Sequence, residues 1–437
     1  MQACRWVLFL RQVFLTAAVL ANCSNEAADL STTGVENLRP FITRTERLAR
    51  PITILSFGDS MADSYRSITC VLMHRFVDRL GVSGHSLDAF ADGNYWRLTN
   101  GAVAVGPDSF WFMTHHQLPP GGGIWWDSYP SALGIWSDTA GFFFVANPNG
   151  GDVTLSISTN AGLWGPLLSL NTYAPSPVGC FTNVVLAADF HRLRIDAQTG
   201  TNIIIGSQLL DSTSSGVHAV FVDEPGISLG DVTNVPLAIR LPVLKVLSPD
   251  LLIWHMKEDG SEDTHVRLIE CEQWWSNAAP DCSVIYIGTP WVSIDKSTTY
   301  TIDQNTLVRS VALDFQHTYA DCMNPAVSYD WMVNMGYMTD VTHENLMGNT
   351  YLANFPWNEL GFFAIGTPRK LDIELTTNGV NLKYQTWTNI LYTIESSDDL
   401  VHWQSVSSQP GDGSIVITNF PSNDLEKSFR LRLNPNN

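Results

Sequence analysis

Two short segments of the sequence carry residue types that could together form an activated serine nucleophile. Gly58-Asp59-Ser60 ends a short apolar run, and Asp340 and His343 lie three residues apart far downstream. A serine hydroxyl becomes a nucleophile when a base takes its proton, and the base needs an acid to orient it. We therefore predict that Ser60 is the nucleophile, His343 the base and Asp340 the orienting acid.

The residues around Ser60 predict the elements that would position its hydroxyl. Residues 53–57 read as a buried strand, and the apolar spacing of residues 70–80 predicts a helix that ends at Gly81. A turn between such elements lies at the carboxyl end of a parallel sheet, where open α/β folds build their sites. The pattern continues with predicted strands at residues 217–222, 251–256 and 284–288 and a predicted helix at residues 306–320.

Gly58-Asp59-Ser60 and Asp340-Val341-Thr342-His343 together resemble the first and last sequence blocks of SGNH (GDSL-type) serine esterases. The resemblance covers residues 51–95 and 217–366. It implies a split hydrolase domain with a flavodoxin-like, three-layer α/β fold. Residues 96–216, rich in Gly, Ser, Thr, Asn and aromatic residues, predict an inserted β-sandwich, because their short runs alternate in polarity. Some SGNH esterases resemble this plan and carry a jelly-roll-like insertion. Residues 367–437 predict a small C-terminal β-sandwich.

The sequence departs from the family where the resemblance implies an oxyanion hole. The family uses the serine amide, a glycine amide and the Asn of a Gly-x-Asn block, but this block reads His255-Met256-Lys257-Glu258 here. We expect the amides of Ser60 and Gly230 and the ammonium of Lys257 to form the hole. Gly84 is the alternative to Gly230. A shift of one residue would instead place Glu258 at the Asn position, where a carboxylate would repel the oxyanion.

Two further patterns offer alternatives or additions to this site. Gly226-Ile227-Ser228-Leu229-Gly230 matches the Gly-x-Ser-x-Gly elbow of α/β-hydrolases, which makes Ser228 the alternative nucleophile. Exposed tryptophan rings bind sugars, so one or two from the insertion could form a glycan platform while the others fill a core. The tryptophans in question are Trp96, Trp111, Trp125, Trp126, Trp136 and Trp164.

The N-terminal sequence predicts export from the cytoplasm. Residues 1–23 combine two arginines with the apolar run 13–21 and read as a signal peptide, and residues 24–50 read as a linker. The segment up to Cys23 resembles a lipoprotein cleavage box, so membrane contact is expected only through a lipid anchor at Cys23. We expect an extracellular or periplasmic protein. Export permits disulfides, and Cys271–Cys282 is the expected pair.

Composition excludes several function classes. The net charge of −19 argues against nucleic acid as a partner. The cysteine and histidine spacings fit no zinc site, and we expect neither a metal nor a cofactor.

These features together predict a secreted serine esterase that removes small acyl groups, acetyl foremost, from acylated polysaccharide or oligosaccharide. Two alternatives remain: a lipase or arylesterase, and a non-catalytic carbohydrate-binding or adhesion protein on a degenerate esterase scaffold.

Overall fold

The protein is described by a computed structural model of the 437-residue chain. The residues that the structure describes are 30–47, 50–62, 67–86, 96–126, 135–159, 163–213, 215–224, 226–257, 261–296, 299–365, 372–376, 379–386, 390–398, 403–412, 414–421 and 428–435. The predicted signal peptide, Cys23 and Glu258 lie outside these ranges.

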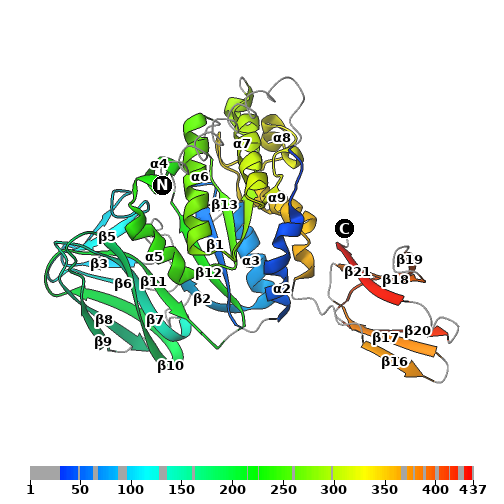
Figure 1. Cartoon of the computed structure of the whole chain (residues 1–437), viewed down its shortest axis with the longest axis horizontal. Coiled ribbons are helices and arrows are strands. Elements are labelled where there is room, and N and C mark those ends of the chain that lie inside the picture. The colour runs from blue at the N-terminus through cyan, green and yellow to red at the C-terminus, as the bar shows by residue number, and fades with distance from the viewer. Residues whose placement is uncertain are drawn as a thin grey trace, which may run out of the picture.

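A parallel sheet forms the centre of the α/β region (Figure 1). Its order β12-β1-β13-β14-β15 is the 2-1-3-4-5 order of flavodoxin-like folds, and β2 adds a further parallel strand beside β12. Every residue of β1 and β12 is buried, which explains their continuous apolar character. The strands are β1 (Ile52–Gly58), β2 (Val82–Ser86), β12 (Val217–Asp223), β13 (Leu251–His255), β14 (Ser283–Ile287) and β15 (Thr318–Ala320).

Helices cover both faces of this sheet and complete a three-layer fold (Figure 1). Side chains of α2 (Arg39–Arg47), α3 (Ile68–Leu80), α8 (Tyr329–Asn334) and α9 (Leu346–Glu359) pack in the core on one face. Side chains of α4 (Leu229–Asn234), α5 (Leu237–Leu247), α6 (Glu262–Ala278) and α7 (Tyr300–Asp314) pack in the core on the other face. The described residues of this region also form 3-10 helices, namely η1 (Val35–Leu38), η2 (Ser293–Lys296), η3 (Asn324–Ala326) and η4 (Phe362–Ala364).

The segment before β1 is helical, and its prediction as a linker was wrong for residues 35–47. Leu38 and Phe41 have no exposed surface and pack in the core of the α/β region. Arg44 and Arg50 both bind the buried carboxylate of Asp250. The many polar residues of the segment concealed an amphipathic helix, because only a narrow stripe of it faces the core.

Two local predictions downstream also need correction. The predicted helix at 306–320 is shorter: α7 ends at Asp314, and residues 318–320 form the edge strand β15. Cys271 and Cys282 are both free thiols rather than a disulfide. Cys271 faces the core from α6, whereas the Cys282 thiol donates to the carbonyl oxygen of Ser283 at 3.3 Å.

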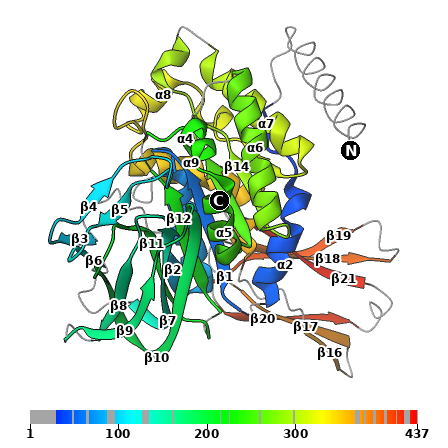
Figure 2. The same cartoon turned by 60° about the vertical axis from the view of Figure 1, so that its left-hand side comes forward.

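The described residues between 96 and 210 include antiparallel strands that continue the parallel sheet through the pairing of β2 with β11 (Figure 2). The long strand β10 pairs with β7 on both sides of an irregularity between Val185 and Asp189, and its last part also pairs with β8 and β6. The β-rich character of residues 96–216 was predicted correctly. The inserted jelly-roll-like sandwich stays a prediction. The strands are β3 (Trp96–Thr99), β4 (Val103–Val105), β5 (His115–Leu118), β6 (Gly123–Trp126), β7 (Ile135–Ala146), β8 (Asp152–Thr159), β9 (Gly165–Asn171), β10 (Val178–Ala197) and β11 (Asn202–Leu210).

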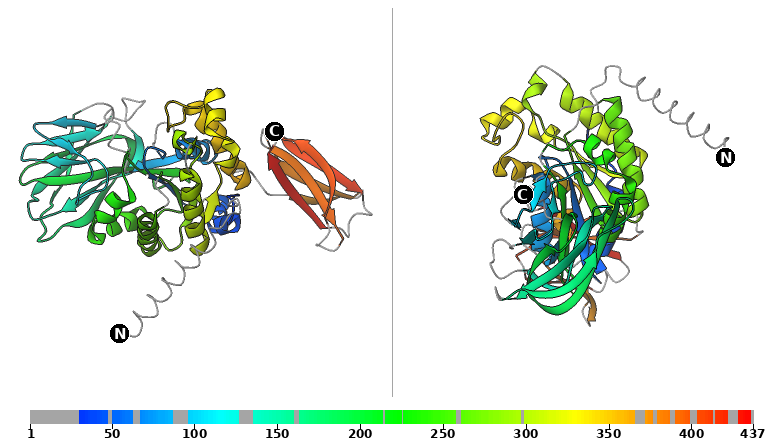
Figure 3. Two further views of the ribbon diagram at one scale, coloured as in Figure 1. Left: turned by 90° about the horizontal axis from the view of Figure 1, so that it is seen from above. Right: turned by 90° about the vertical axis from the view of Figure 1, so that its left-hand side faces the viewer.

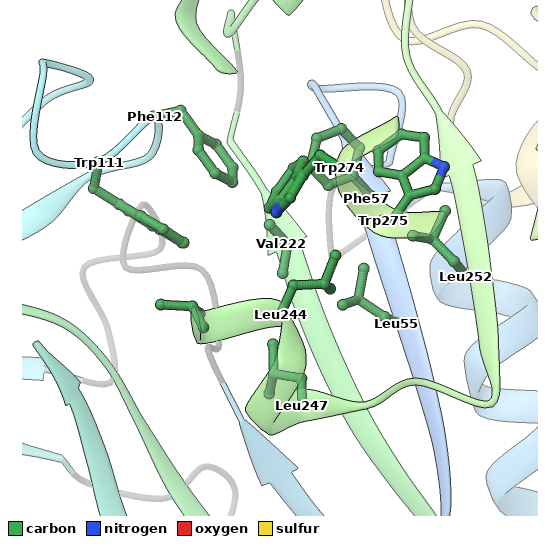
Figure 4. Close-up of a pocket in the computed structure, with 11 residues that line it drawn as sticks. Leu55, Phe57, Trp111, Phe112, Val222, Leu244, Leu247, Leu252, Trp274 and Trp275 are labelled. Atoms are coloured by element: carbon green, nitrogen blue, oxygen red, sulfur yellow. The ribbon is translucent and has the colours of Figure 1, made fainter. Parts of the chain in front are cut away.

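Aromatic side chains fill the junction between these strands and the parallel sheet (Figure 4). Trp111 is 1% exposed and stacks on Phe112, with their ring centroids 4.5 Å apart. Phe112 in turn contacts Phe57 of β1 and Trp274 of α6. The cavity here holds about 10 Å³, roughly the room of one water molecule. Trp111 is therefore a core residue and takes no part in a sugar platform.

The C-terminal residues form two three-stranded antiparallel sheets, coloured orange to red in Figure 3. Their facing sides share one apolar core, which includes Leu382, Tyr384, Tyr392 and Ile394. The strands are β16 (Asp372–Thr376), β17 (Gly379–Gln385), β18 (Ile390–Ser397), β19 (Gln404–Pro410), β20 (Ile415–Pro421) and β21 (Ser428–Pro435). Nowhere in the described ranges is a helix long and apolar enough to cross a membrane.

Candidate active site

The turn that presents Ser60 depends on a close approach between two parallel strands. A Cβ atom on Gly58 would lie 1.9 Å from the carbonyl oxygen of His255, so only glycine fits where β1 and β13 end. Asp59 is buried, and its two carboxylate oxygens accept the N–H groups of Met61 at 2.9 Å and Lys257 at 3.2 Å. These bonds fix the turn at the carboxyl end of the sheet and leave the Ser60 side chain partly exposed.

The structure brings the three predicted residues Ser60, His343 and Asp340 together. Nε2 of His343 lies 2.8 Å from Oγ of Ser60, although 283 residues separate them in sequence. Nδ1 of the same ring lies 2.9 Å and 3.1 Å from the two carboxylate oxygens of Asp340. The imidazole therefore bridges a hydroxyl and a carboxylate, which is the geometry that general-base activation of a serine requires.

Backbone hydrogen bonds hold Asp340 in its ionised form. Its Oδ1 accepts the N–H groups of Thr342 at 2.7 Å and His343 at 2.8 Å. These two bonds, together with the bond from the His343 ring, lower the pKa of Asp340 to about 2. Just downstream, the Asn345 side chain accepts the Gly348 N–H at 3.0 Å and caps α9. The turn and the helix start together orient the imidazole toward Ser60.

The two alternatives for the glycine of the oxyanion hole lie at opposite ends of the parallel strands. Gly84 pairs with His218 near the start of β12, level with Thr53. It is therefore about 16 Å along the strands from Gly58 and does not belong to the site. Gly230 lies in the first turn of α4, which follows the carboxyl end of β12. Gly230 and Ser60 thus both follow the carboxyl ends of the parallel strands. The part of Gly230 in an oxyanion hole stays a prediction.

Lys257 lies beside the Ser60 turn, two residues beyond the end of β13. Besides the bond from its N–H group to Asp59, its ammonium lies 5.7 Å from the centre of the Tyr300 ring. The side-chain amide of Gln304 donates to the carbonyl oxygen of Met256 at 2.8 Å and holds the same loop. The structure therefore places Lys257 at the active-site edge, whereas Glu258 lies outside the described residues.

Ser228 has a structural role, so its interpretation as the alternative nucleophile was wrong. Its hydroxyl donates to the Asp231 carboxylate at 2.9 Å, and Asp231 N–H returns a bond to it at 3.3 Å. This is a capping box at the start of α4. The Gly-x-Ser-x-Gly match therefore reflects a helix start.

The sequence did not reveal two buried acidic residues near the carboxyl ends of the parallel strands. Glu224 follows β12, and its carboxylate accepts both the N–H and the hydroxyl of Thr114, at 3.1 Å and 2.9 Å. This anchors the loop before β5 close to the carboxyl end of the sheet. Glu344, directly after His343, is 5% exposed. Burial raises its pKa to about 7, and burial likewise raises the pKa of Asp59 to about 6. Only the position of Glu224 after a buried strand could have signalled such a role.

Within the described ranges, no three His, Cys, Asp or Glu side chains are grouped so that they could hold a metal ion.

Comparison with known proteins identifies the fold. No family model matches the chain, and no curated protein matches it. A solved peptidoglycan O-acetylesterase aligns with a TM-score of 0.58 and 18% identity, over 74% of this chain and 95% of that one. A GDSL-like lipase from Parabacteroides merdae (TM-score 0.28, 12% identity, 33% of this chain and 72% of that one) aligns too loosely to define a fold. The same holds for a family 2 carbohydrate esterase from Corynascus thermopiles (TM-score 0.27, 12% identity, 61% and 99%). The chain therefore shares the fold of that solved O-acetylesterase, which agrees with the resemblance of its Gly-Asp-Ser and Asp-x-x-His segments to SGNH esterases.

Proposed function

We propose that this chain is a serine carboxylic-ester hydrolase in which Ser60 attacks, His343 acts as base and Asp340 orients the base. The observation that carries this proposal is the continuous contact from Ser60 Oγ through the imidazole to the carboxylate, at 2.8 Å and 2.9 Å. A degenerate scaffold with a binding role alone has no need of this geometry.

The mechanism follows from these contacts. Ser60 Oγ attacks the ester carbonyl carbon while His343 Nε2 takes the hydroxyl proton, and the tetrahedral oxyanion then expels the alcohol, which receives that proton. A water molecule, deprotonated by the same nitrogen, attacks the acyl-serine and releases the carboxylic acid. Asp340 stays ionised throughout, because its pKa is about 2, and it stabilises the imidazolium.

The oxyanion would be bound by the amides of Ser60 and Gly230 and by the Lys257 ammonium. The support is positional: Gly230 follows β12 and Lys257 follows β13, and both strands flank β1 at the edge that carries Ser60. A lysine replaces the neutral amide of the SGNH pattern with a point charge, which stabilises an oxyanion electrostatically.

The substrate we propose is an O-acetylated polysaccharide or oligosaccharide. The fold shared with a peptidoglycan O-acetylesterase supports this class. The site is also open, since the His343 and Asp340 side chains are 40% and 50% exposed. Small-molecule sites are concave and enclose most of their ligand, whereas a polymer needs an open approach. In the predicted mature state the protein is exported, free or lipid-anchored at Cys23.

Apolar residues near the base favour a second candidate, a lipase or arylesterase. Val341, Leu346 and Met347 are 61%, 58% and 60% exposed, and all three lie within four residues of His343. An exposed apolar rim suits an acyl chain or an aryl group. A series of p-nitrophenyl esters of increasing chain length separates the two: preference for acetate supports the first candidate, and preference for longer chains the second.

The decisive assay measures release of acetate from O-acetylated polysaccharides, peptidoglycan included, and hydrolysis of p-nitrophenyl acetate. We expect Ser60→Ala to abolish both activities. Ser310→Ala on α7 is the matched control and should keep wild-type rates. The Ser310 hydroxyl donates to the carbonyl oxygen of Leu307 in the same helix. Full activity in Ser60→Ala would refute the proposal.

A further inference from the structure

The Thr114 loop, residues 106–114 between β4 and β5, belongs to the β-rich region and has a fixed shape of its own. One carboxylate oxygen of Asp108 accepts the N–H groups of Phe110 at 2.7 Å and Trp111 at 3.3 Å. The Asp108 N–H in turn donates to the Trp111 carbonyl oxygen at 2.9 Å. These bonds close a tight turn, so the loop does not depend on a ligand for its conformation.

Aromatic packing places the Thr114 loop close to the carboxyl end of β1 (Figure 4). The Phe112 side chain has no exposed surface, and its ring centroid lies 5.9 Å from that of Phe57. Phe57 is the third residue before Ser60. Met113 is buried in the same core, whereas Thr114 is half-buried. The loop is therefore packed down beside the strand that ends at the nucleophile.

Glu224 ties the Thr114 loop to the nucleophile turn by hydrogen bonds. Its two carboxylate oxygens accept the Thr114 N–H at 3.1 Å and the Thr114 hydroxyl at 2.9 Å. Its own N–H donates to the carbonyl oxygen of Gly58, two residues before Ser60, at 3.2 Å. One buried residue therefore bridges the loop and the turn. Because two donors of Thr114 meet two oxygens of one carboxylate, the bridge fixes the direction of the loop as well as its distance.

The outer side chains of the Thr114 loop suit a sugar. Ser109 is exposed, Phe110 is partly exposed and Thr114 is half-buried. Hydroxyl groups exchange hydrogen bonds with sugar hydroxyls, and an aromatic ring offers an apolar surface to the C–H groups of a sugar ring. The loop thus brings glycan-binding chemistry from the β-rich region to the end of the sheet that carries Ser60.

We propose that the Thr114 loop is a wall of the active site that binds the sugar carrying the scissile ester, and that Glu224 is the positioning residue that holds this wall in place. The inference rests on the proposed function as an esterase of O-acetylated glycans. Ordering a loop when a ligand binds lowers the net affinity, so a wall held in advance binds the sugar more tightly. Glu224 would act on substrate affinity through Thr114.

Kinetics on a large and a small ester test this role. The large ester is the O-acetylated polysaccharide, peptidoglycan included, from which the wild type releases acetate. The small ester is ethyl acetate, whose two-carbon alcohol offers no sugar ring to the loop. We expect Glu224→Ala to raise KM for the polysaccharide about 10-fold and to change kcat less than about 2-fold, because the wall binds the sugar equally in the ground and transition states. For ethyl acetate kcat/KM should stay within about 2-fold of wild type.

Two milder variants separate positioning from other roles. Glu224→Gln should keep KM within about 3-fold of wild type, because an amide can accept the Thr114 N–H and donate to its hydroxyl. An acid–base role of Glu224 would not survive this change. Thr114→Val should raise KM for the polysaccharide about 5-fold in the wild type and less than about 2-fold in Glu224→Ala. Glu374→Ala in β16 and Thr154→Val in β8 are the matched controls and should leave KM unchanged.

The opposite results are equally clear. An equal loss on both esters, or the same Thr114→Val loss in both backgrounds, would overturn the proposal. Thr114→Val alone gives the comparison of the two esters if Glu224→Ala does not fold, and an unchanged KM for the polysaccharide would then overturn it.

Hydrogen exchange gives a readout that does not depend on activity. In Glu224→Ala the Thr114 amide should exchange at least about 5-fold faster than in the wild type, because its acceptor is gone. Unchanged exchange would overturn the anchoring. Full activity in Ser60→Ala together with faster exchange in Glu224→Ala would refute the serine mechanism and leave the anchoring of the loop standing.

Discussion

At the residue scale, the sequence named the three side chains that the structure brings into contact, Ser60, His343 and Asp340. Asp340 and His343 lie on one turn, so three residues of sequence already implied their contact. The bond from His343 to Ser60 spans 283 residues, and only the resemblance to a family linked the two. Glu344 and Asp59 show the limit of such reasoning, since burial and its effect on pKa depend on neighbours that no local pattern names.

Lys257 is the residue whose role the sequence left most open. If its ammonium binds the oxyanion, Lys257→Ala should lower kcat on the order of 100-fold with little effect on KM, because the charge develops only in the transition state. Lys257→Asn should retain more activity, since it restores a neutral donor. Steady-state kinetics on p-nitrophenyl acetate measure both. Wild-type kcat in both variants would show that backbone amides alone form the hole.

Gly58 is expected to tolerate no side chain. In Gly58→Ala the added Cβ would meet the His255 carbonyl at 1.9 Å, so β1 and β13 must separate at the active-site edge. We expect a loss of at least about 2 kcal/mol in unfolding free energy, together with loss of activity. The control is Gly106→Ala, where a Cβ would meet no atom within 4 Å. Equal stability of the two variants would contradict the close approach.

The buried acids predict a pH effect on stability. Asp59 has a folded-state pKa of about 6 against an ordinary 3.8, so the folded protein binds this proton more tightly than the unfolded chain. Its contribution is present below about pH 4 and is lost as the pH rises toward 6. Relative to Asp59→Asn, the wild type should therefore lose on the order of 2 kcal/mol between these values. Denaturant titrations at both ends measure the difference, and a constant difference would argue against a raised pKa.

At the scale of elements, strands and helices with a strong hydrophobic pattern could be predicted from the sequence, whereas those with a weak pattern could not. Strands β1, β12, β13 and β14 were predicted because buried parallel strands are continuous apolar runs. Helix α2 was taken for a linker because its polar residues outnumber those that face the core. The end of α7 was misplaced because the turn at Phe315 and the short edge strand β15 follow it without a Gly or Pro signal. The course of β10, which pairs with three other strands, depends on long-range contacts that the sequence does not encode locally.

Helix α2 should contribute to the stability of the α/β core. Phe41 has no exposed surface and packs edge-to-face on Phe76 and Phe362, at 5.7 Å and 6.1 Å between centroids. Phe41→Ala should therefore cost about 3–5 kcal/mol of unfolding free energy. Arg39→Ala, at an exposed position of the same helix, should change it by less than about 0.5 kcal/mol. Similarly small changes in unfolding free energy for both variants would show that this segment adds little to the core and acts as a linker.

At the scale of the whole molecule, a flavodoxin-like sheet carries the site and a β-rich region continues that sheet on the side of β2. Thr114 and Trp111 join the two regions close to the carboxyl ends of the parallel strands. The place of the β-rich region in the chain was predictable from the change in composition at residue 96. Its union with the parallel sheet was not predictable, because the pairing of β2 with β11 joins segments more than a hundred residues apart.

The central claim is that Ser60 is an activated nucleophile. The most direct measurement is the mass of the intact protein and of its peptides after reaction with a fluorophosphonate probe. We predict one adduct per chain on Ser60, and strongly slowed labelling in His343→Ala, because the hydroxyl then has no base. An unmodified Ser60 in folded wild-type protein, or labelling that is equally fast without His343, would contradict the account.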